Sequence, residues 1–328
     1  MTRLVTEGFE MGDDDAFTGG GSFSVVSDGY VRSGNYAARS PGDGYFSVSS
    51  LSEVYIRFSV LIRNDNQPFY VYLEDTLNDD DLVRITITEQ SNMTAHIDGS
   101  LVDTGSYVFY KNINYLIEVY ANIDDSSGRI ITKVNGVEDI NYSGDTDPTS
   151  SSVIDYVNFT NPAVQYKYID DIAINDTNGS EDNSWCGDGR IIAIKPNGNG
   201  DQSDLTGSDS DSTDNYLLVD DIPSDGDSTY VWSDTATDFD LYNLTAPSLP
   251  VNHRITRIYA EARAKDPDTG DIKLIIKPDS TVYKDSAATT LTTSYSAIKG
   301  DEYTENPDDG NAWEESDLDD LQAGVEIQ

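Results

Sequence analysis

Apolar and polar side chains alternate with a period of two through much of the first half of the chain. In the segment Val54–Ile62, every second residue is apolar and lies on one face of an extended strand: Val54, Ile56, Phe58, Val60 and Ile62. Successive side chains of a strand point to opposite faces, so the spacing predicts a strand with one buried side. The same alternation predicts strands at Phe69–Leu73, Leu82–Thr88, Tyr115–Tyr120, Arg129–Val134, Val153–Phe159 and Tyr168–Ile174.

Short turn sequences separate these predicted strands. Asp98-Gly99 and Asn135-Gly136 are dipeptides that favour tight hairpin turns, because both residue types tolerate positive φ. Many short strands joined by such turns, with no long helical pattern between them, are typical of an antiparallel β-sandwich. We therefore predict an all-β protein.

The composition changes after residue 176. Residues 176–240 are rich in Asp, Gly, Ser and Asn, and their basic residues are Arg190 and Lys195. We predict a jelly-roll-like sandwich domain at 1–176, a linker at 177–189 and a second sandwich domain with long acidic loops at 190–328. Strands are expected in this second domain at Ile191–Lys195, Tyr216–Asp220, Ile255–Ala264, Ile272–Ile276, Leu291–Tyr295 and Val325–Gln328.

One short helix is expected near the C-terminus, over Ser316–Gly324. Ser316 can act as N-cap, Asp319 stands at the capping-box position and Gly324 can end the helix. Leu318 and Leu321 would then pack inward.

The charge excludes one class of partner. The 328 residues include 60 acids and 20 bases, a formal net charge of −40. Such a field repels phosphate backbones, so we expect no binding to nucleic acid. Hydrophobic residues are only 37 % of the chain, but 21 tyrosines and many β-branched residues allow modest cores with long polar loops.

The segment at the start and the single cysteine bear on location. Cys186 is alone, so no internal disulfide can form. The first residues lack the apolar region of a signal peptide, and no apolar run is long enough to cross a membrane. We expect assembly in a cytoplasm without membrane insertion.

No combination of residues indicates a catalytic site. His96 and His253 are the two histidines, and each stands apart from a nucleophile motif. The Glu-x-Asp-x-(x)-Glu spacing of glucanases with a jelly-roll fold is also missing. We predict that the protein is not an enzyme.

Calcium is the cofactor that the acidic turns could hold, because Ca²⁺ takes several oxygen ligands from flexible loops. The candidate ligands are Asn197, Asn199, Asp201, Asp209, Asp211 and Asp214. The first three begin like an EF-hand loop, but Gln202 stands where that loop needs Gly and Ser208 where it needs Glu. Solvated acidic turns are the alternative interpretation.

Residues 4–174 resemble the concanavalin A-like lectin/glucanase (laminin-G-like) jelly rolls. The resemblance lies in Glu7-Gly-Phe9, Ser33-Gly-Asn-Tyr-Ala37, Tyr115–Tyr120, Gly128–Gly136 and Tyr168–Ile174. It implies that the last segment is a closing strand beside the N-terminal one. It implies little about activity, because this fold includes lectins, hydrolases and inert modules.

The whole chain resembles structural proteins of tailed phages that join such a jelly roll to a second β domain. Here the junction reads Asn183-Ser-Trp-Cys-Gly-Asp-Gly189, and the ending contains Asn311-Ala-Trp313 and Leu321–Val325. The resemblance implies a non-catalytic virion protein of a tail, fibre or capsid exterior. Its expected partners are other virion proteins, copies of itself and host glycans. A free glycan-binding lectin or a glycosidase-like protein is the alternative.

Exposed tyrosines are the candidate glycan contacts on the concave face of the jelly roll. From the alternation alone these are Tyr70, Tyr72, Tyr107 and Tyr110. Aromatic rings suit both sugar stacking and protein interfaces, and a decoration module without a sugar ligand would fit the same features. A place in the core is the other interpretation of these tyrosines.

Overall fold

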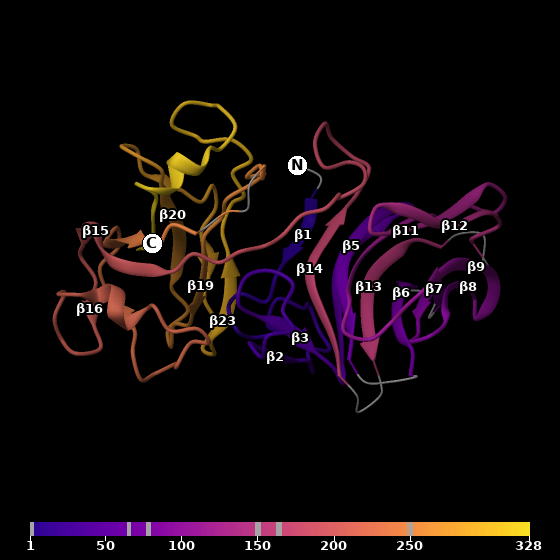
Figure 1. Ribbon diagram of the computed structural model, residues 1–328. Coiled ribbons are helices and arrows are strands. Elements are labelled where there is room, and N and C mark those ends of the chain that lie inside the picture. Colours follow the sequence, from indigo (N-terminus) through magenta and orange to yellow (C-terminus); the bar gives the residue numbers. More distant parts are fainter. Residues whose placement is uncertain are drawn as a thin grey trace. The chain divides into compact units, whose positions relative to one another are not determined.

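The computed structural model describes residues 3–63, 67–76, 80–147, 152–161, 166–247, 249 and 252–328. The chain forms two compact units, Met1–Ile192 (unit 1) and Ala193–Gln328 (unit 2) (Figure 1). Both are built from antiparallel sheets, which confirms the predicted all-β fold.

Unit 1 contains a larger sheet, sheet A. Its strands are β1 (Arg3–Glu7), β2 (Ser24–Val26), β3 (Ala37–Arg39), β5 (Glu53–Ile62), β10 (Asn114–Asn122), β11 (Gly128–Val134), β12 (Val137–Gly144) and β14 (Lys167–Asn175). They are ordered β12-β11-β10-β5-β14-β3-β2, and β1 also pairs with β14. The closing strand therefore lies beside the N-terminal strand, as the jelly-roll resemblance implied.

Sheet B is the second layer of unit 1. Its strands are β4 (Gly42–Leu51), β6 (Phe69–Asp75), β7 (Asp80–Ile87), β8 (Asn92–Ile97), β9 (Ser100–Val108) and β13 (Ile154–Asn161). They are ordered β4-β13-β6-β7-β8-β9. In Figure 1 the two layers can be followed by β14 and β5 in one sheet and β13 and β6 in the other.

The core of unit 1 lies between these sheets and follows the alternation of the sequence. Val54, Ile56 and Phe58 of β5 are at most 1 % exposed. The Phe58 ring contacts the rings of Phe69 and Phe159 from sheet B, at centroid separations of 6.0 and 5.4 Å. Edge-to-face and tilted aromatic pairs at such distances add to the free energy of apolar burial.

The predicted tight turns are confirmed at the hairpin ends. Asp98 and Gly99 have φ of 44° and 70°, and Asn135 and Gly136 have φ of 51° and 80°. Two successive residues with positive φ match the right-handed twist of the strands that they join.

Unit 2 has one six-stranded sheet and two smaller ones. Its strands are β15 (Pro196–Ser203), β16 (Thr206–Gly207), β17 (Val231–Trp232), β18 (Phe239–Leu244), β19 (Glu261–Ala264), β20 (Asp271–Lys277), β21 (Tyr283–Lys284), β22 (Thr289–Thr290), β23 (Ser296–Lys299) and β24 (Gln322–Ile327). The larger sheet runs β15-β18-β24-β20-β21, with β22 also on β20. Its two small apolar clusters centre on Leu274 and on Trp313.

Several predicted strands of unit 2 are wrong or shortened. Residues Ile191–Lys195 form no strand, and Tyr216–Asp220 lies mostly in a 3₁₀ helix, η1 (Asn215–Leu218). The buried Asn215 amide donates to the carbonyl of Leu205 (3.0 Å) and to Asp240 (2.6 Å), which favours a turn at this position. Strand β19 begins only at Glu261, and Leu291–Tyr295 forms no strand.

The predicted C-terminal helix is also wrong in length and type. The structure has a 3₁₀ helix, η2 (Glu315–Leu318), whose capping box is formed by Glu314 and Asp317. From Gln322 onward the backbone of β24 pairs with both β18 and β20. Residues 322–324, which the predicted helix included, therefore belong to this central strand. Gly324 lies in this strand, where the carbonyl oxygen of Asp240 is 1.8 Å from the place of a Cβ.

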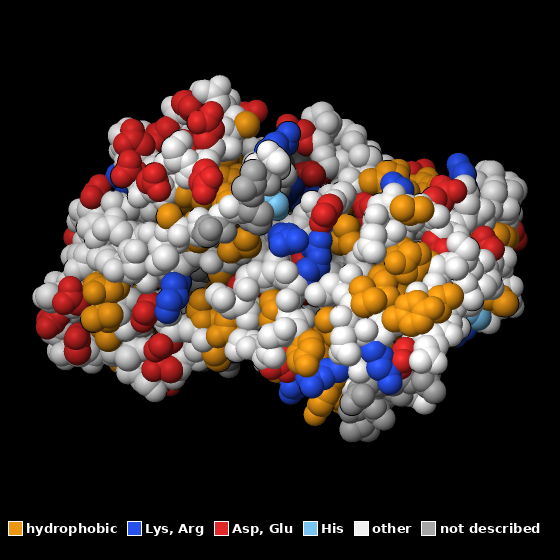
Figure 2. Space-filling model, in the orientation of Figure 1, with side chains coloured by type: hydrophobic (Ala, Val, Ile, Leu, Met, Phe, Trp, Pro, Cys, Tyr) orange, Lys and Arg blue, Asp and Glu red, His pale blue; other side chains and the backbone are white. Residues whose placement is uncertain are grey.

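Acidic side chains form several groups on the surface (Figure 2). Figure 2 shows Asp and Glu gathered over the C-terminal part of unit 2, among other places. Within the described residues, no helix is long and apolar enough to span a membrane.

The closing strand β14 has an irregularity in its centre. Its pairing with β5 shifts between Asp170 and Ala173, and Asp171 adopts φ 54°. A bulge of this kind re-aims side chains. Both carboxylates are buried, and Asp170 accepts hydrogen bonds from the backbone amides of Arg32 (3.0 Å) and Ser33 (3.2 Å).

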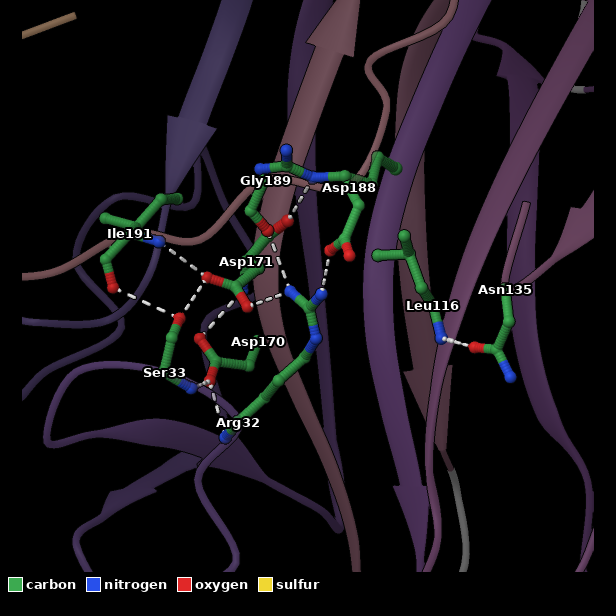
Figure 3. A network of polar contacts seen from close by, with 10 residues as sticks. Arg32, Ser33, Leu116, Asn135, Asp170, Asp171, Asp188, Gly189 and Ile191 are labelled. Carbon is green, nitrogen blue, oxygen red and sulfur yellow. Dashed lines mark hydrogen bonds and ion pairs between the residues drawn. The ribbon is translucent and has the colours of Figure 1, made fainter. Parts of the chain in front are cut away.

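Asp171 joins this strand to the residues that follow the predicted linker. Its carboxylate accepts from the Arg32 guanidinium, the Ser33 hydroxyl and the amide of Ile191 (Figure 3). Arg32 also donates to the carbonyl of Gly189 (2.8 Å) and to Asp188. The end of the predicted linker is thus bound to unit 1.

Candidate functional site

The outer face of sheet B carries a group of half-buried aromatic side chains. Along β6, the inward residues Phe69, Val71 and Leu73 are at most 1 % exposed, whereas Tyr70 and Tyr72 between them are only partly buried. The period of two thus places these tyrosines on the side of the sheet away from the core.

Strand register places further side chains in line with Tyr72. Its neighbour on β13 is Asn158, which in turn lies opposite Tyr45 of β4. Its neighbour on β7 is Arg84, which lies opposite His96 of β8. Residues directly opposite in an antiparallel pair share a face at about 5 Å, so this row crosses five strands on the outer face.

Two tyrosine pairs form the aromatic part of this surface. The rings of Tyr45 and Tyr156 are stacked at 4.4 Å, with an interplanar angle of 28°. The rings of Tyr70 and Tyr72 are tilted at 5.6 Å. We call the four residues Tyr45, Tyr70, Tyr72 and Tyr156 the tyrosine face.

Hydrogen bonds hold the polar side chains between the two tyrosine pairs. Asn158 Nδ2 donates to Glu74 Oε1 (3.1 Å), and the Thr160 hydroxyl lies within 3.0 Å of Asn158 Oδ1. Burial raises the pKa of Glu74, and the hydrogen bond from Asn158 opposes that rise. These bonds hold the side-chain amide of Asn158 in one orientation, with Nδ2 toward Glu74 and Oδ1 toward Thr160.

Arg84 and His96 form the other end of the row. The Arg84 guanidinium carbon lies 5.7 Å from the centroid of the Tyr70 ring. Burial raises the pKa of the Tyr72 hydroxyl, and a hydrogen bond with Arg84 opposes the rise. Burial and then the charge of Arg84 lower the pKa of His96, which favours its neutral form. Its Nε2 lies 3.1 Å from the Thr94 hydroxyl.

This arrangement suits binding of a flat polar molecule. Half-exposed rings offer apolar surfaces, and the side chains beside them offer donors and acceptors at fixed positions. The positions lie on paired strands rather than on loops, so little conformational entropy is lost when a ligand binds.

The four tyrosines predicted from alternation do not form one group. Tyr70 and Tyr72 belong to the tyrosine face. Tyr107 is 36 % exposed, and its ring contacts those of Phe109 and Tyr115, each at 5.6 Å. Tyr110 is 55 % exposed and has no ring contact with the tyrosine face among the described residues.

The residues proposed as calcium ligands have other partners in unit 2. Asp201 forms an ion pair of 2.9 Å with Lys277, and its pKa is lowered by that lysine. Asn199 donates to Asp214 (3.5 Å), while Asp211 Oδ1 accepts from the amide of Thr213 (2.7 Å). Asp209 accepts from the amide of Asp211 at 3.4 Å, and Asn197 lies in strand β15. Within the described ranges no three Asp, Glu, His or Cys side chains gather as a metal site, so calcium binding stays a prediction.

Sequence reasoning missed most of the site. Tyr45, Tyr156, Asn158, Arg84 and His96 each occupy an outward position of a strand, and alternation alone could have identified that position. Their meeting depends on the order of the strands, because β4, β6 and β13 are neighbours in space but far apart in sequence.

Comparisons with known proteins give no family. No family model matches the chain, and no curated protein matches it either.

Among solved structures, a sialidase matches over 54 % of this chain with 10 % identity and a TM-score of 0.38, and the chain spans only 18 % of that protein. The cellulose-induced protein Cip1 matches over 56 % of this chain and 100 % of its own length, with 16 % identity and a TM-score of 0.40. The carbohydrate-binding module CBM66 from Bacillus subtilis matches over 47 % of this chain and 92 % of its own, with 12 % identity and a TM-score of 0.34. At these TM-scores the similarities do not carry a function over to this chain.

Proposed function

We propose that unit 1 is a carbohydrate-binding module and that its glycan lies on the tyrosine face of sheet B. The observation that carries the proposal is that two pairs of tyrosines lie on the neighbouring strands β4, β13 and β6. Between these pairs, Asn158 is hydrogen-bonded to Glu74. Sugar rings have apolar C–H faces and hydroxyl edges. Such a ring can stack on a tyrosine while its hydroxyls bond to the amide and the carboxylate.

The exposure of these rings supports a binding role over a purely structural one. The core of unit 1 already contains a full set of buried aromatics, including Phe58 and Phe159 at 0 % exposure. Four tyrosines on the opposite face add nothing to that core. Partly exposed aromatic surface on a rigid sheet is the kind of surface at which ligands bind.

We further propose that binding is not followed by catalysis. Burial raises the pKa of the Cys186 thiol to about 11, which makes it a poor nucleophile. His96 is held by Thr94 and has its pKa lowered. Incubating the protein with each glycan that it binds, and analysing the products by mass spectrometry, tests this directly. Shortened or unsaturated oligosaccharides would overturn the non-catalytic proposal.

The setting that we propose is a phage particle, where the module would contact host glycans beside other virion proteins and copies of itself. The support for this setting is the resemblance of the junction around Trp185 and of the segment after Asn311. Mass spectrometry and cryo-electron microscopy of purified particles from the source culture test it. Finding the chain only outside particles would overturn the setting and favour a free lectin.

A glycan array tests the binding proposal. The wild-type protein is expected to bind a defined subset of glycans. Tyr72→Ala and Tyr156→Ala are each expected to weaken binding roughly tenfold, because each removes one stacking ring worth about 1.4 kcal/mol. Tyr110→Ala removes an exposed tyrosine outside the tyrosine face and is the matched control. Binding that depends on Tyr110 and not on Tyr72 would overturn the proposed site.

A further inference from the structure

Arg84 is the one Lys or Arg in the described strands of sheet B. It lies beside the tyrosine face, directly opposite Tyr72 on one side and His96 on the other. The rest of that face is neutral or acidic, with Glu74 on the same strand as Tyr72 and Asp43 on β4. The outer face of sheet B therefore has one Lys or Arg among its described strands, which is Arg84.

The charge of Arg84 is not neutralised by a carboxylate that the structure describes. In a chain with 60 acids and 20 bases, ion pairing within the chain is common. Arg39 pairs with Asp28, and Arg257 pairs with Glu302. For Arg84 the described residues provide no ion pair, and its buried Nε has no hydrogen-bond partner among them. A half-buried guanidinium without an ion-pair partner has N–H donors that are available to a ligand.

The neighbours of Arg84 position it without neutralising it. The Tyr70 ring lies 5.7 Å from its guanidinium carbon, and the Tyr72 hydroxyl bonds to it. The lowered pKa of His96 favours its neutral form, which adds no second positive charge. Aromatic rings beside an arginine hold the planar guanidinium and leave its remaining N–H groups for a ligand.

We propose that the glycan bound by the tyrosine face is acidic, and that the carboxylate of a hexuronic acid residue binds the Arg84 guanidinium. This inference rests on the proposed function. The planar fork of arginine matches a carboxylate with two parallel hydrogen bonds, while the sugar ring of the same residue stacks on Tyr70 or Tyr72.

The surrounding acids restrict where the uronic acid sits. Glu74 lies opposite Tyr156 and two residues from Tyr72 on β6, and Asp43 of β4 lies opposite Thr160. The carboxylates of Glu74 and Asp43 repel the carboxylate of a uronic acid, so neutral sugars are expected to occupy the part of the face near Tyr45 and Tyr156. The ligand class is therefore a glycan whose uronic acid is accommodated at one end of the site.

The test compares each acidic glycan with its own neutral form. Alginate, polygalacturonate, hyaluronan and glucuronoxylan oligosaccharides are each immobilised before and after reduction of the carboxylates to alcohols, beside a panel of neutral glycans. The wild-type protein is expected to bind at least one acidic form roughly 10- to 100-fold more tightly than its reduced partner, as for a charged hydrogen bond of about 1.5–3 kcal/mol. Raising the salt concentration should reduce that difference.

Variants assign the effect to Arg84. Arg84→Gln is expected to remove the preference for the acidic form, and Arg84→Lys to retain a part of it, because lysine keeps the charge without the fork. Arg129→Gln is the matched control, since this exposed arginine lies on β11 of sheet A. The comparison of acidic and reduced glycans uses the wild-type protein, so it holds even where a variant is unstable.

The outcomes separate this inference from the proposed function. Equal binding of acidic and reduced glycans, lost in Tyr72→Ala, would overturn the role of Arg84 and leave carbohydrate binding in place. An acidic preference that Arg84→Gln does not change would also overturn it. Binding to no glycan of either panel would overturn both proposals.

Discussion

The amide nitrogen of Ile191 donates a hydrogen bond of 2.7 Å to Oδ1 of Asp171 in the closing strand of unit 1. The same carboxylate is fully buried and also binds Arg32 and Ser33. Gly189 faces the Arg57 guanidinium so closely that a Cβ would overlap it. The segment before unit 2 is therefore held on the closing strand through the buried Asp171 and through Arg32, which binds Gly189 and Asp188.

Asp171→Asn is expected to destabilise unit 1 by about 3 kcal/mol, because it leaves the nearly buried Arg32 without its buried partner. Asp188→Asn removes the other carboxylate on Arg32, which is 72 % exposed, and is expected to cost less than about 1 kcal/mol. Urea unfolding of both variants measures the difference. Equal losses would show that Asp171 does not hold the junction.

The Cys186 thiol is expected to react slowly in the folded protein. It faces the backbone carbonyls of Tyr55 and Ala173, and burial raises its pKa to about 11. The thiolate is the reactive form, so alkylation by iodoacetamide at pH 8 should be about a hundredfold slower than in urea-unfolded chain. Mass spectrometry of timed samples gives both rates, and similar rates would contradict the raised pKa of this thiol.

The contribution of Asp124 to the free energy of unfolding is expected to be lost in acid. Hydrogen bonds from the amides and hydroxyls of Ser127 and Ser126 lower its pKa to about 2 from an ordinary value of 3.8. A lowered folded pKa means that the contribution is present above about pH 4 and is lost as the pH falls toward 2. The difference in unfolding free energy between wild type and Asp124→Asn should therefore shrink over that range. An NMR titration that places Asp124 near 3.8 would contradict this.

Two adjacent residues of β6 separate folding from binding. Phe69→Ala is expected to cost about 3–5 kcal/mol of stability, since the ring is 0 % exposed in the core. Tyr70→Ala should change stability by less than about 1 kcal/mol and weaken glycan binding. Thermal unfolding and glycan titration of both variants provide the two readouts. A stability loss in Tyr70→Ala as large as that in Phe69→Ala would place Tyr70 with the core.

Seven strands of unit 1 (β5, β6, β7, β10, β11, β13 and β14) could be predicted from the alternation of apolar and polar residues in each segment. The segment Val54–Ile62 is one such case, and it forms β5 with Val54, Ile56 and Phe58 buried. In unit 2 the apolar runs are shorter and separated by long polar loops. Tyr216–Asp220 then forms mostly 3₁₀ helix, because the side chain of Asn215 bonds to Leu205 and Asp240, which lie far from it in sequence.

The candidate site could be predicted only in part for a related reason. The outward direction of Tyr70 and Tyr72 follows from the pattern of a single strand. The position of Tyr72 between Asn158 and Arg84 follows from strand order and register, which local sequence does not specify.

The most direct test of the central claim is chemical-shift mapping on the full chain with isotope-labelled tyrosines, using a glycan identified on the array. Resonances of Tyr45, Tyr70, Tyr72 and Tyr156 are expected to shift on titration, while those of Tyr107 and Tyr110 stay in place. Shifts confined to Tyr107 and Tyr110, or to tyrosines of unit 2, would show that the glycan does not bind the tyrosine face.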